Sequence, residues 1–244
     1  MSNFQSYNVI VCDHPWSFSD QLKQSSVKRG ASSNYLTMSI DDIKNMKIKD
    51  LADPNGAVLA MWVPSSLLIE GLDIMKHYGF HYKQNYIWVK TKKEPLEEVS
   101  SVINKSIKIA TKISSISDLK SSLKDLSVAA ADTIHNLDFS SLLGFGMGHL
   151  FRQTHEICII GINNNKIYKK LQNKSQRSVS LATNLKHSQK PEHLQDSFDL
   201  MFDQNCKKIE LFSRRQRPGW DCIGNQAPNT IGQDINISIE NLIK

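Results

Sequence analysis

The chain has 244 residues, of which 40% are hydrophobic, and a formal net charge of +6. This length and composition favour one α/β domain with a sizeable core and exclude collagen-like, low-complexity and mostly disordered chains. No apolar stretch is long enough to cross a bilayer, and the first residues carry no secretory signal. The sequence therefore predicts an intracellular protein without membrane contact, cytoplasmic in a bacterium or phage-infected cell and nuclear in a eukaryote.

The first third of the chain predicts two strands and two helices. Residues 8–12 and 56–63 are short apolar runs that end at turn residues, which is typical of buried strands. Ser39 is a suitable N-cap for a short helix, because Asp42 stands three residues later in a capping box. Residues 66–78 carry a helical apolar stripe that ends at a glycine.

Three further apolar runs, at residues 86–89, 156–160 and 208–212, predict more strands. A helix is expected from Pro191 to about Phe202, with Pro191 and Glu192 in its first turn. Alternation of buried strands with amphipathic helices indicates an α/β fold with a parallel or mixed sheet, covered on both faces.

Residues 95–143 interrupt this alternation and predict a helical insertion in a single domain spanning residues 1–244. The stretch lacks glycine, and its apolar residues recur at nearly helical spacing. One long helix and a helical hairpin are both compatible with the pattern. The insertion is interpreted either as a packing or oligomerisation element or as a lid that clamps the substrate.

Four cysteines, at positions 12, 158, 206 and 222, are far apart and form no C-x-x-C pair. This spacing argues against a zinc ribbon or a redox dithiol and predicts buried free thiols. No metal site is expected.

The end of the first strand carries the sequence Asp13-His14-Pro15-Trp16. Ligands of open α/β sheets gather beyond the carboxyl ends of the strands. There, a carboxylate that accepts N–H groups lies next to an aromatic face on which a base can stack. The alternative interpretation is a simple turn with an anchored tryptophan.

A basic run, Arg214 to Arg217, follows the strand at residues 208–212. Arginine suits carboxylate, phosphate and ribose groups, and this position is where a sheet binds ligands. The alternative is a solvated loop.

Taken together, these motifs resemble the adenine-N6 methyltransferase family that includes the catalytic subunit of the eukaryotic mRNA m6A writer. Residues 232–235 are more similar to the phage and bacterial DNA branch of that family. The resemblance is carried by Asp13-His14-Pro15-Trp16, Asn34 to Ser39, Leu59 to Val63, Trp88 to Thr91, His155-Glu156, His187 to Pro191, Glu210 to Phe212, Arg217 to Asp221 and Gly224 to Gln226.

The resemblance implies a Rossmann-like methyltransferase fold in permuted order, with the catalytic loop before the cofactor motif. The implied cofactor is S-adenosylmethionine, and no metal is needed. Asp13 is assigned to the target amine and to the methionine end of the cofactor, with Phe212 lining the pocket. The other implied cofactor residues are Lys190 for the carboxylate, Arg214 and Gln226 for the ribose, and Asn225 for the adenine.

The implied reaction is methyl transfer to N6 of adenine in DNA. RNA remains an alternative substrate, and a catalytically inactive nucleic-acid-binding partner of such an enzyme is the second class of function. A homo-oligomer or a partner subunit is also compatible with the family. Expected substrate contacts are Trp16 for an extruded base and Tyr35 near the target. Phosphate contacts are expected from Lys28 and Arg29, from Lys90 to Lys93, or from Arg215 and Arg217, and the alternative for each cluster is a solvated surface.

The catalytic motif departs from the family at one position, because His14 stands where a proline is usual. The backbone carbonyl of this residue, rather than its side chain, is expected to hold the second hydrogen of the target amine. That carbonyl is unaffected by the exchange, although the loop loses one fixed φ angle. Asp13, His14, Pro15 and Trp16 are therefore all predicted to serve catalysis.

Overall fold

The structure is a computed structural model that describes residues 6–17, 37–92, 142–144, 150–183 and 189–244, with single residues at 101, 104, 108, 124, 127, 128, 146 and 148. The chain divides into two compact units. The first consists of Met1–Trp88, Glu156–Ser180 and Pro191–Lys244, and the second of Val89–His155 and Leu181–Lys190.

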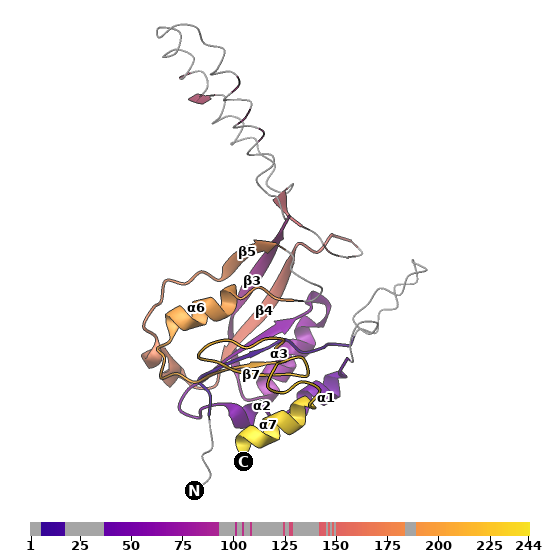
Figure 1. The fold of residues 1–244 in the computed structure, drawn as a ribbon, viewed down its shortest axis with the longest axis vertical. Helices are drawn as coiled ribbons and strands as arrows, with labels where there is room; N and C mark the ends of the chain where they lie inside the picture. Colours follow the sequence, from indigo (N-terminus) through magenta and orange to yellow (C-terminus); the bar gives the residue numbers. More distant parts are fainter. Residues whose placement is uncertain are drawn as a thin grey trace, which may run out of the picture. The chain divides into compact units, whose positions relative to one another are not determined.

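A seven-stranded sheet has the order β5-β3-β4-β2-β1-β6-β7 (Figure 1). β1 pairs in parallel with β2 and β6, β6 pairs in parallel with β7, and β4 runs antiparallel to β2. The sheet is therefore mixed, in agreement with one of the two predicted forms. Its strands are β1 (Val9–Cys12), β2 (Val58–Val63), β3 (His81–Thr91), β4 (His155–Ile162), β5 (Val179–Thr183), β6 (Lys208–Leu211) and β7 (Asp221–Ile223).

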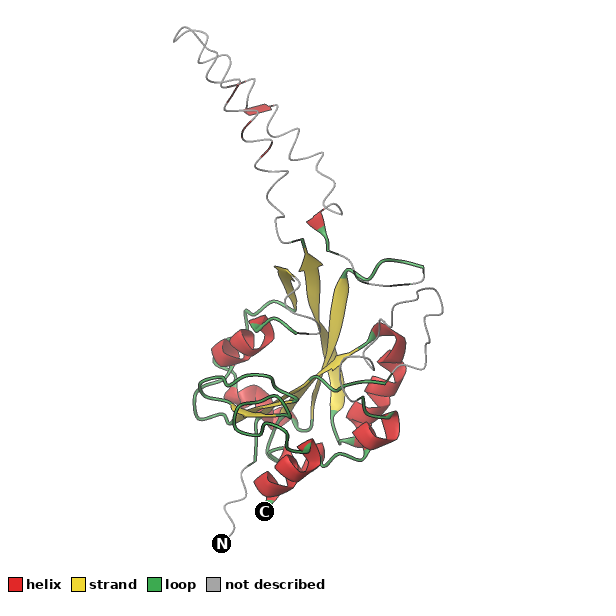
Figure 2. Ribbon diagram, turned by 45° about the vertical axis from the view of Figure 1, so that its right-hand side comes forward, coloured by secondary structure: helices red, strands yellow, loops and turns green. Residues whose placement is uncertain are grey.

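Helices lie on both sides of the strands (Figure 2). On one face Cys12 belongs to a core cluster that includes Ile43 of α1. On the other face Lys208, the neighbour of Val9, reaches Asp199 of α6 at 3.3 Å. This two-sided arrangement confirms the Rossmann-like fold class. The helices are α1 (Ile40–Lys44), α2 (Ile48–Leu51), α3 (Leu68–His77), α6 (His193–Met201) and α7 (Ile235–Ile243), with 3₁₀ turns η2 (Ser65–Leu67) and η4 (Asn165–Lys170).

Local signals fixed the helix ends on this scaffold. Ser39 caps α1 and forms the predicted capping box with Asp42. α3 stops at Tyr78, and Gly79 follows with φ 81°, a left-handed conformation that glycine adopts without strain. The predicted start of α6 was wrong by two residues, because Pro191 lies outside the helix and Glu192 is its N-cap residue.

Among the described elements, five were not predicted from the sequence: α2, η4, β5, β7 and α7. β7 has only three residues, and β5 is the outermost strand with no buried residue. Short strands at the rim of a sheet carry little of the apolar pattern that marks a central strand.

The predicted insertion at residues 95–143 lies almost entirely outside the described residues. Six of its described positions are helical and exposed, namely Ser101, Asn104, Lys108, Lys124, Ser127 and Val128. Its interpretation as a packing element or a lid stays a prediction, as does the single domain.

The prediction of buried free cysteines is confirmed for all four. Within the described part of the chain, no helix is long and apolar enough to cross a membrane. The same residues contain no group of three or more His, Cys, Asp or Glu side chains suited to a metal ion.

Candidate active site

The carboxyl ends of three parallel strands meet at one edge of the first unit. Cys12 at the end of β1 pairs with Leu211 of β6, which in turn pairs with Ile223 of β7. The residues that follow these three strands therefore emerge side by side. These are Asp13 after β1, Phe212 after β6 and Gly224 after β7.

The turn after β1 is fixed by the backbone next to α1. Trp16 N–H donates to the carbonyl of His14 at 2.9 Å, and Met38 N–H donates to the carbonyl of Pro15 at 2.8 Å. Ser17 N–H returns a bond to the Met38 carbonyl at 3.2 Å. Asp13 is half-buried at the start of this turn. A second lone pair of the His14 carbonyl remains for a further donor.

Trp16 is a core residue with 4% of its surface exposed. Its indole N–H donates to the carbonyl of Trp62 at 3.0 Å. The geometry is that of the anchored tryptophan, the alternative interpretation of the motif. Because protein covers the ring, stacking of a target base on it stays a prediction.

His14 is buried to 3% exposure, which the sequence did not predict for a turn residue. Its ring lies between Trp16, at a centroid distance of 5.5 Å, and Phe212, at 5.2 Å. Neither ring nitrogen has a hydrogen-bond partner. Burial lowers the pKa of His14 from 6.5 to about 3, so the ring is neutral at physiological pH.

We expect His14 to make the fold sensitive to mild acid. Between about pH 6.5 and pH 3 the unfolded chain binds a proton that the folded chain excludes, so stability falls as the pH falls through this window. From pH 7.5 to pH 5.0 this amounts to about 2 kcal/mol. Urea unfolding at pH 7.5 and pH 5.0 should therefore show that the free energy of unfolding falls more in the wild type than in His14→Leu. Equal losses in both proteins would contradict the buried neutral ring.

The ends of β6 and β7 are in close contact beside Asp13. Ser213 N–H donates to the carbonyl of Ile223 at 3.0 Å. A Cβ on Gly224 would lie 2.6 Å from the carbonyl oxygen of Ser213, so only glycine fits there. Phe212 has φ 61°, an uncommon left-handed conformation for a bulky residue. Such backbone strain is typical of functional sites.

The loop after β7 is organised by Thr230 and presents two amide side chains. Thr230 Oγ1 accepts from Gly224 N–H at 2.9 Å and donates to the Gly224 carbonyl at 2.7 Å. Gly232 N–H donates to the carbonyl of Asn225 at 2.9 Å. The side chains of Asn225 and Gln226 are exposed on this loop.

Glu210 is an acidic residue of this site to which the sequence assigned no role. It pairs with Val11, two residues before Asp13. Burial raises the pKa of Glu210, Arg215 opposes the rise, and the charge of Asp13 adds to it. One of its carboxylate oxygens has no hydrogen-bond partner. Two carboxylates near one strand end favour a cationic ligand.

Carboxylates surround the guanidinium of Arg217, so the expectation that this residue contacts phosphate stays a prediction. Arg217 lies 2.6 Å from Glu192, 2.6 Å from Asp196 and 2.7 Å from Asp199. Arg215 pairs with Glu192 at 2.9 Å. These ion pairs link the loop after β6 to α6 and to its N-cap residue. No local sequence pattern predicted them.

Five of the remaining predicted residues lie in the second unit or outside the described residues, and Arg214 follows β6. Lys90 and Lys190 belong to the second unit and are half-buried there. Tyr35, Lys28 and Arg29 lie outside the described residues. Arg214 is exposed, directly after the strained Phe212 and the buried Ser213.

The donor set at the strand ends fits S-adenosylmethionine. Asp13 offers a carboxylate for an ammonium group, and Phe212 offers an apolar wall. Arg214, Asn225 and Gln226 are exposed hydrogen-bonding side chains suited to ribose hydroxyls and a purine edge. The glycine at position 224 lets the two loops that carry them approach closely.

The comparison with known families agrees with this geometry. The MT-A70 family matches residues 7–137 and 136–226, which is most of the chain. No curated protein matches it. MT-A70 proteins are S-adenosylmethionine-dependent methyltransferases that act on N6 of adenine. Because the match covers most of the chain, including Asp13, Phe212, Asn225 and Gln226, the chain belongs to the MT-A70 family.

Proposed function

We propose that the chain methylates N6 of adenine in DNA, with S-adenosylmethionine as the methyl donor. One observation carries the proposal. The parallel ends of β1, β6 and β7 bring Asp13, Phe212 and the loop of Asn225 and Gln226 to a single edge. Target and cofactor groups of a methyltransferase must meet at such a point for in-line transfer.

On this proposal, the residues after β6 and β7 hold the cofactor. Arg214 and Gln226 bind the ribose, Asn225 binds the adenine, and Phe212 covers the pocket. Lys190 is proposed for the carboxylate of the methionine end. The bound cofactor supplies an activated methyl group on a sulfonium, whose positive charge suits the neighbouring Asp13 and Glu210.

The turn after β1 acts on the target amine. The nitrogen of an exocyclic adenine amine is a poor nucleophile because its lone pair is delocalised into the ring. Hydrogen bonds from its two N–H groups to the Asp13 carboxylate and the His14 carbonyl favour pyramidal geometry at nitrogen. They also stabilise the positive charge that develops there during attack. The backbone bonds of Pro15 and Ser17 to Met38 fix the turn that carries both residues beforehand.

DNA is proposed over RNA because residues 232–235 resemble the DNA branch of the family. In the structure these residues lead into α7, with Asp234 as its N-cap. A base in duplex DNA must leave the stack to reach Asp13, which is the usual route for enzymes that modify bases.

The test is transfer of labelled methyl groups to unmethylated duplex DNA, single-stranded DNA and RNA in parallel. Asp13→Ala is the control, and nucleoside analysis identifies N6-methyladenine. The proposal expects label in DNA that Asp13→Ala abolishes. Label only in RNA would overturn the choice of polymer. Cofactor binding without transfer to any polymer would favour the inactive partner-subunit alternative.

A further inference from the structure

The positive charge of the chain is concentrated in one stretch of sequence. Residues 157–191 contain seven lysines and arginines and no acidic residue. The other 209 residues contain 23 basic and 24 acidic residues, a formal charge of −1. The net charge of +6 is therefore a local property, and such asymmetry is typical of surfaces that bind polyanions.

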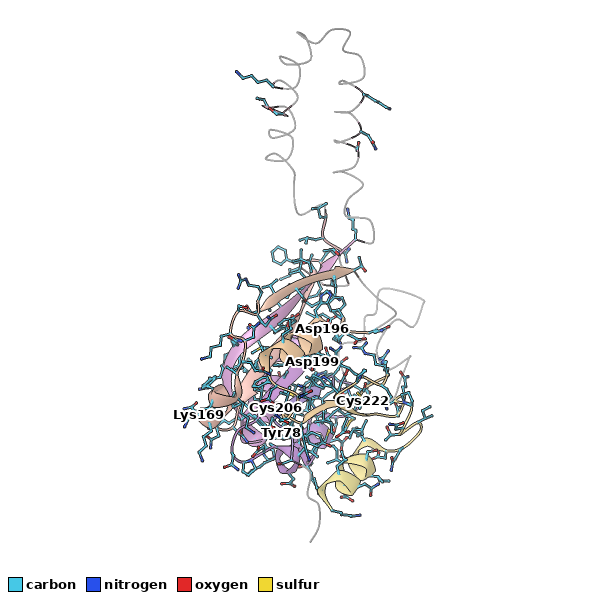
Figure 3. All side chains as sticks on the ribbon, turned by 60° about the vertical axis from the view of Figure 1, so that its left-hand side comes forward. Tyr78, Lys169, Asp196, Asp199, Cys206 and Cys222 are labelled. Carbon is cyan, nitrogen blue, oxygen red and sulfur yellow. The ribbon has the colours of Figure 1, made fainter. Side chains whose placement is uncertain are left out.

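Five of these charges lie in residues 166–177 of the first unit, here called the basic segment. They are Lys166, Lys169, Lys170, Lys174 and Arg177, all exposed except the half-buried Lys170. Because a 3₁₀ helix has three residues per turn, η4 places Lys166 and Lys169 on the same face. Figure 3 shows Lys169 at the periphery of the molecule, away from Asp196 and Asp199.

The basic segment is held firmly against the turn that precedes β2. Ile167 is 1% exposed, and an added Cβ on Gly56 would lie 2.6 Å from its backbone nitrogen. The side chain of Asn163 donates to the carbonyl of Asp53 at 2.9 Å, and that of Asn164 accepts from Lys166 N–H at 3.0 Å. The lysines therefore project from a fixed backbone.

Most of this charge is not neutralised by neighbouring carboxylates. Within the described part of the chain, Lys170 is the one member in an ion pair, with Asp53 at 3.3 Å. Arg215 and Arg217 near the active site differ in this respect, because Glu192, Asp196 and Asp199 surround them. Of these two clusters, the basic segment is thus the better phosphate-binding surface.

The basic segment begins at the edge of the sheet opposite Asp13. β4 runs antiparallel to β2, so Ile162, just before the segment, pairs with Val58 at the start of β2. Asp13 follows Cys12, which pairs with Met61 near the other end of β2. Ile167 of the segment packs on Gly56, which is six residues before Trp62, the residue level with Asp13, and six residues of strand span about 20 Å. At about 3.4 Å per nucleotide, this corresponds to roughly six nucleotides.

We propose that the basic segment binds backbone phosphates of the DNA substrate, roughly six or more nucleotides from the target adenine. The proposal rests on the proposed function for the identity of the polyanion. Lysines on one face of η4 contact phosphates without reading bases, so they contribute affinity and no sequence preference. The segment anchors the DNA while the strand ends perform the transfer.

The test compares two double variants that remove the same charge. Lys166→Gln/Lys169→Gln alters the basic segment. Lys76→Gln/Lys244→Gln removes two exposed lysines from α3 and the end of α7, helices that pack in the same core cluster as Cys12. Binding to a 24-base-pair duplex with one central target adenine is measured by fluorescence anisotropy over a range of salt concentrations.

We expect Lys166→Gln/Lys169→Gln to make the negative slope of log affinity against log salt concentration shallower by about 1.8. This corresponds to about 0.9 per lost phosphate contact. The control variant should keep the wild-type slope. A hairpin with three base pairs on each side of the adenine is too short to reach the segment, so all three proteins should bind it alike. The rate of methyl transfer at saturating DNA and the cofactor affinity should not change.

An unchanged slope in the first variant, or an equal drop in the control, overturns the inference. Its failure is distinguishable from failure of the proposed function. If methyl groups are transferred to DNA but the slope does not change, the proposed function is supported and phosphate binding by the basic segment is refuted. If the slope changes in a protein that binds DNA but transfers no methyl group, phosphate binding by the basic segment is supported and the proposed methyltransferase function is refuted.

Discussion

Asp13→Asn should reduce the single-turnover rate of methyl transfer by about 10²- to 10³-fold, the usual effect of removing one such electrostatic contact. The amide keeps the shape of the side chain but loses the negative charge that stabilises the developing positive charge on the target nitrogen. The turn itself should persist, because its bonds join the backbones of His14, Pro15 and Met38. Rapid-quench measurement at saturating cofactor and DNA tests this expectation.

Asp50→Asn is the matched control, because Asp50 is an exposed carboxylate in the first turn of α2. It should transfer methyl groups at the wild-type rate. Circular dichroism and the urea midpoint show whether the two variants fold alike. A properly folded Asp13→Asn protein with the wild-type rate would remove Asp13 from the catalytic mechanism.

Arg217→Met should lower the free energy of unfolding by about 2 kcal/mol. The methionine keeps an apolar stem beside Trp220, whereas the three carboxylates within 2.7 Å of the guanidinium lose their shared cation. Removal of one partner from a buried ion pair costs about 3–5 kcal/mol. The expected loss is smaller here because Glu192, Asp196 and Asp199 are 35–54% exposed. A drop of roughly 4–8 °C in Tm follows for a chain of this size.

Arg177→Met provides the control for Arg217→Met. Arg177 is exposed, and its guanidinium donates to the carbonyl of Ser175 at 2.8 Å. Its substitution should change Tm by less than about 1 °C. The loss in Arg217→Met should also shrink in 1 M salt, which screens the repulsion among the carboxylates. If the drop in Tm of Arg217→Met does not depend on salt, the cause is lost packing and not repulsion among the carboxylates.

The sequence predicted those parts of the fold that depend on near neighbours. The capping box of Ser39 and Asp42 spans four residues, and the stop at Gly79 is set by one backbone conformation. The strands at the centre of the sheet were found because burial on both faces makes them uniformly apolar. For the same reason the ends of β1 and β6 were located to within one residue.

Features that depend on distant partners were not predictable in this way. Trp16 is buried because the carbonyl of Trp62, 46 residues later, receives its N–H. The three carboxylates of Arg217 lie 18 to 25 residues before it, on or beside a helix whose packing the sequence does not specify. His14 is enclosed because Phe212, from the far end of the chain, packs against it.

The position of β1 in the sheet also constrains how the protein folds during synthesis. β1 lies between β2 and β6, and Val9 pairs with Lys208. At roughly 5–20 residues per second, the ribosome needs on the order of 10–40 s to deliver the second neighbour. Until then one side of a fully apolar strand has no partner, which favours aggregation or chaperone binding. Because the loops that follow β6 and β7 arrive later still, the edge that carries Asp13 and Phe212 is assembled only near the end of synthesis.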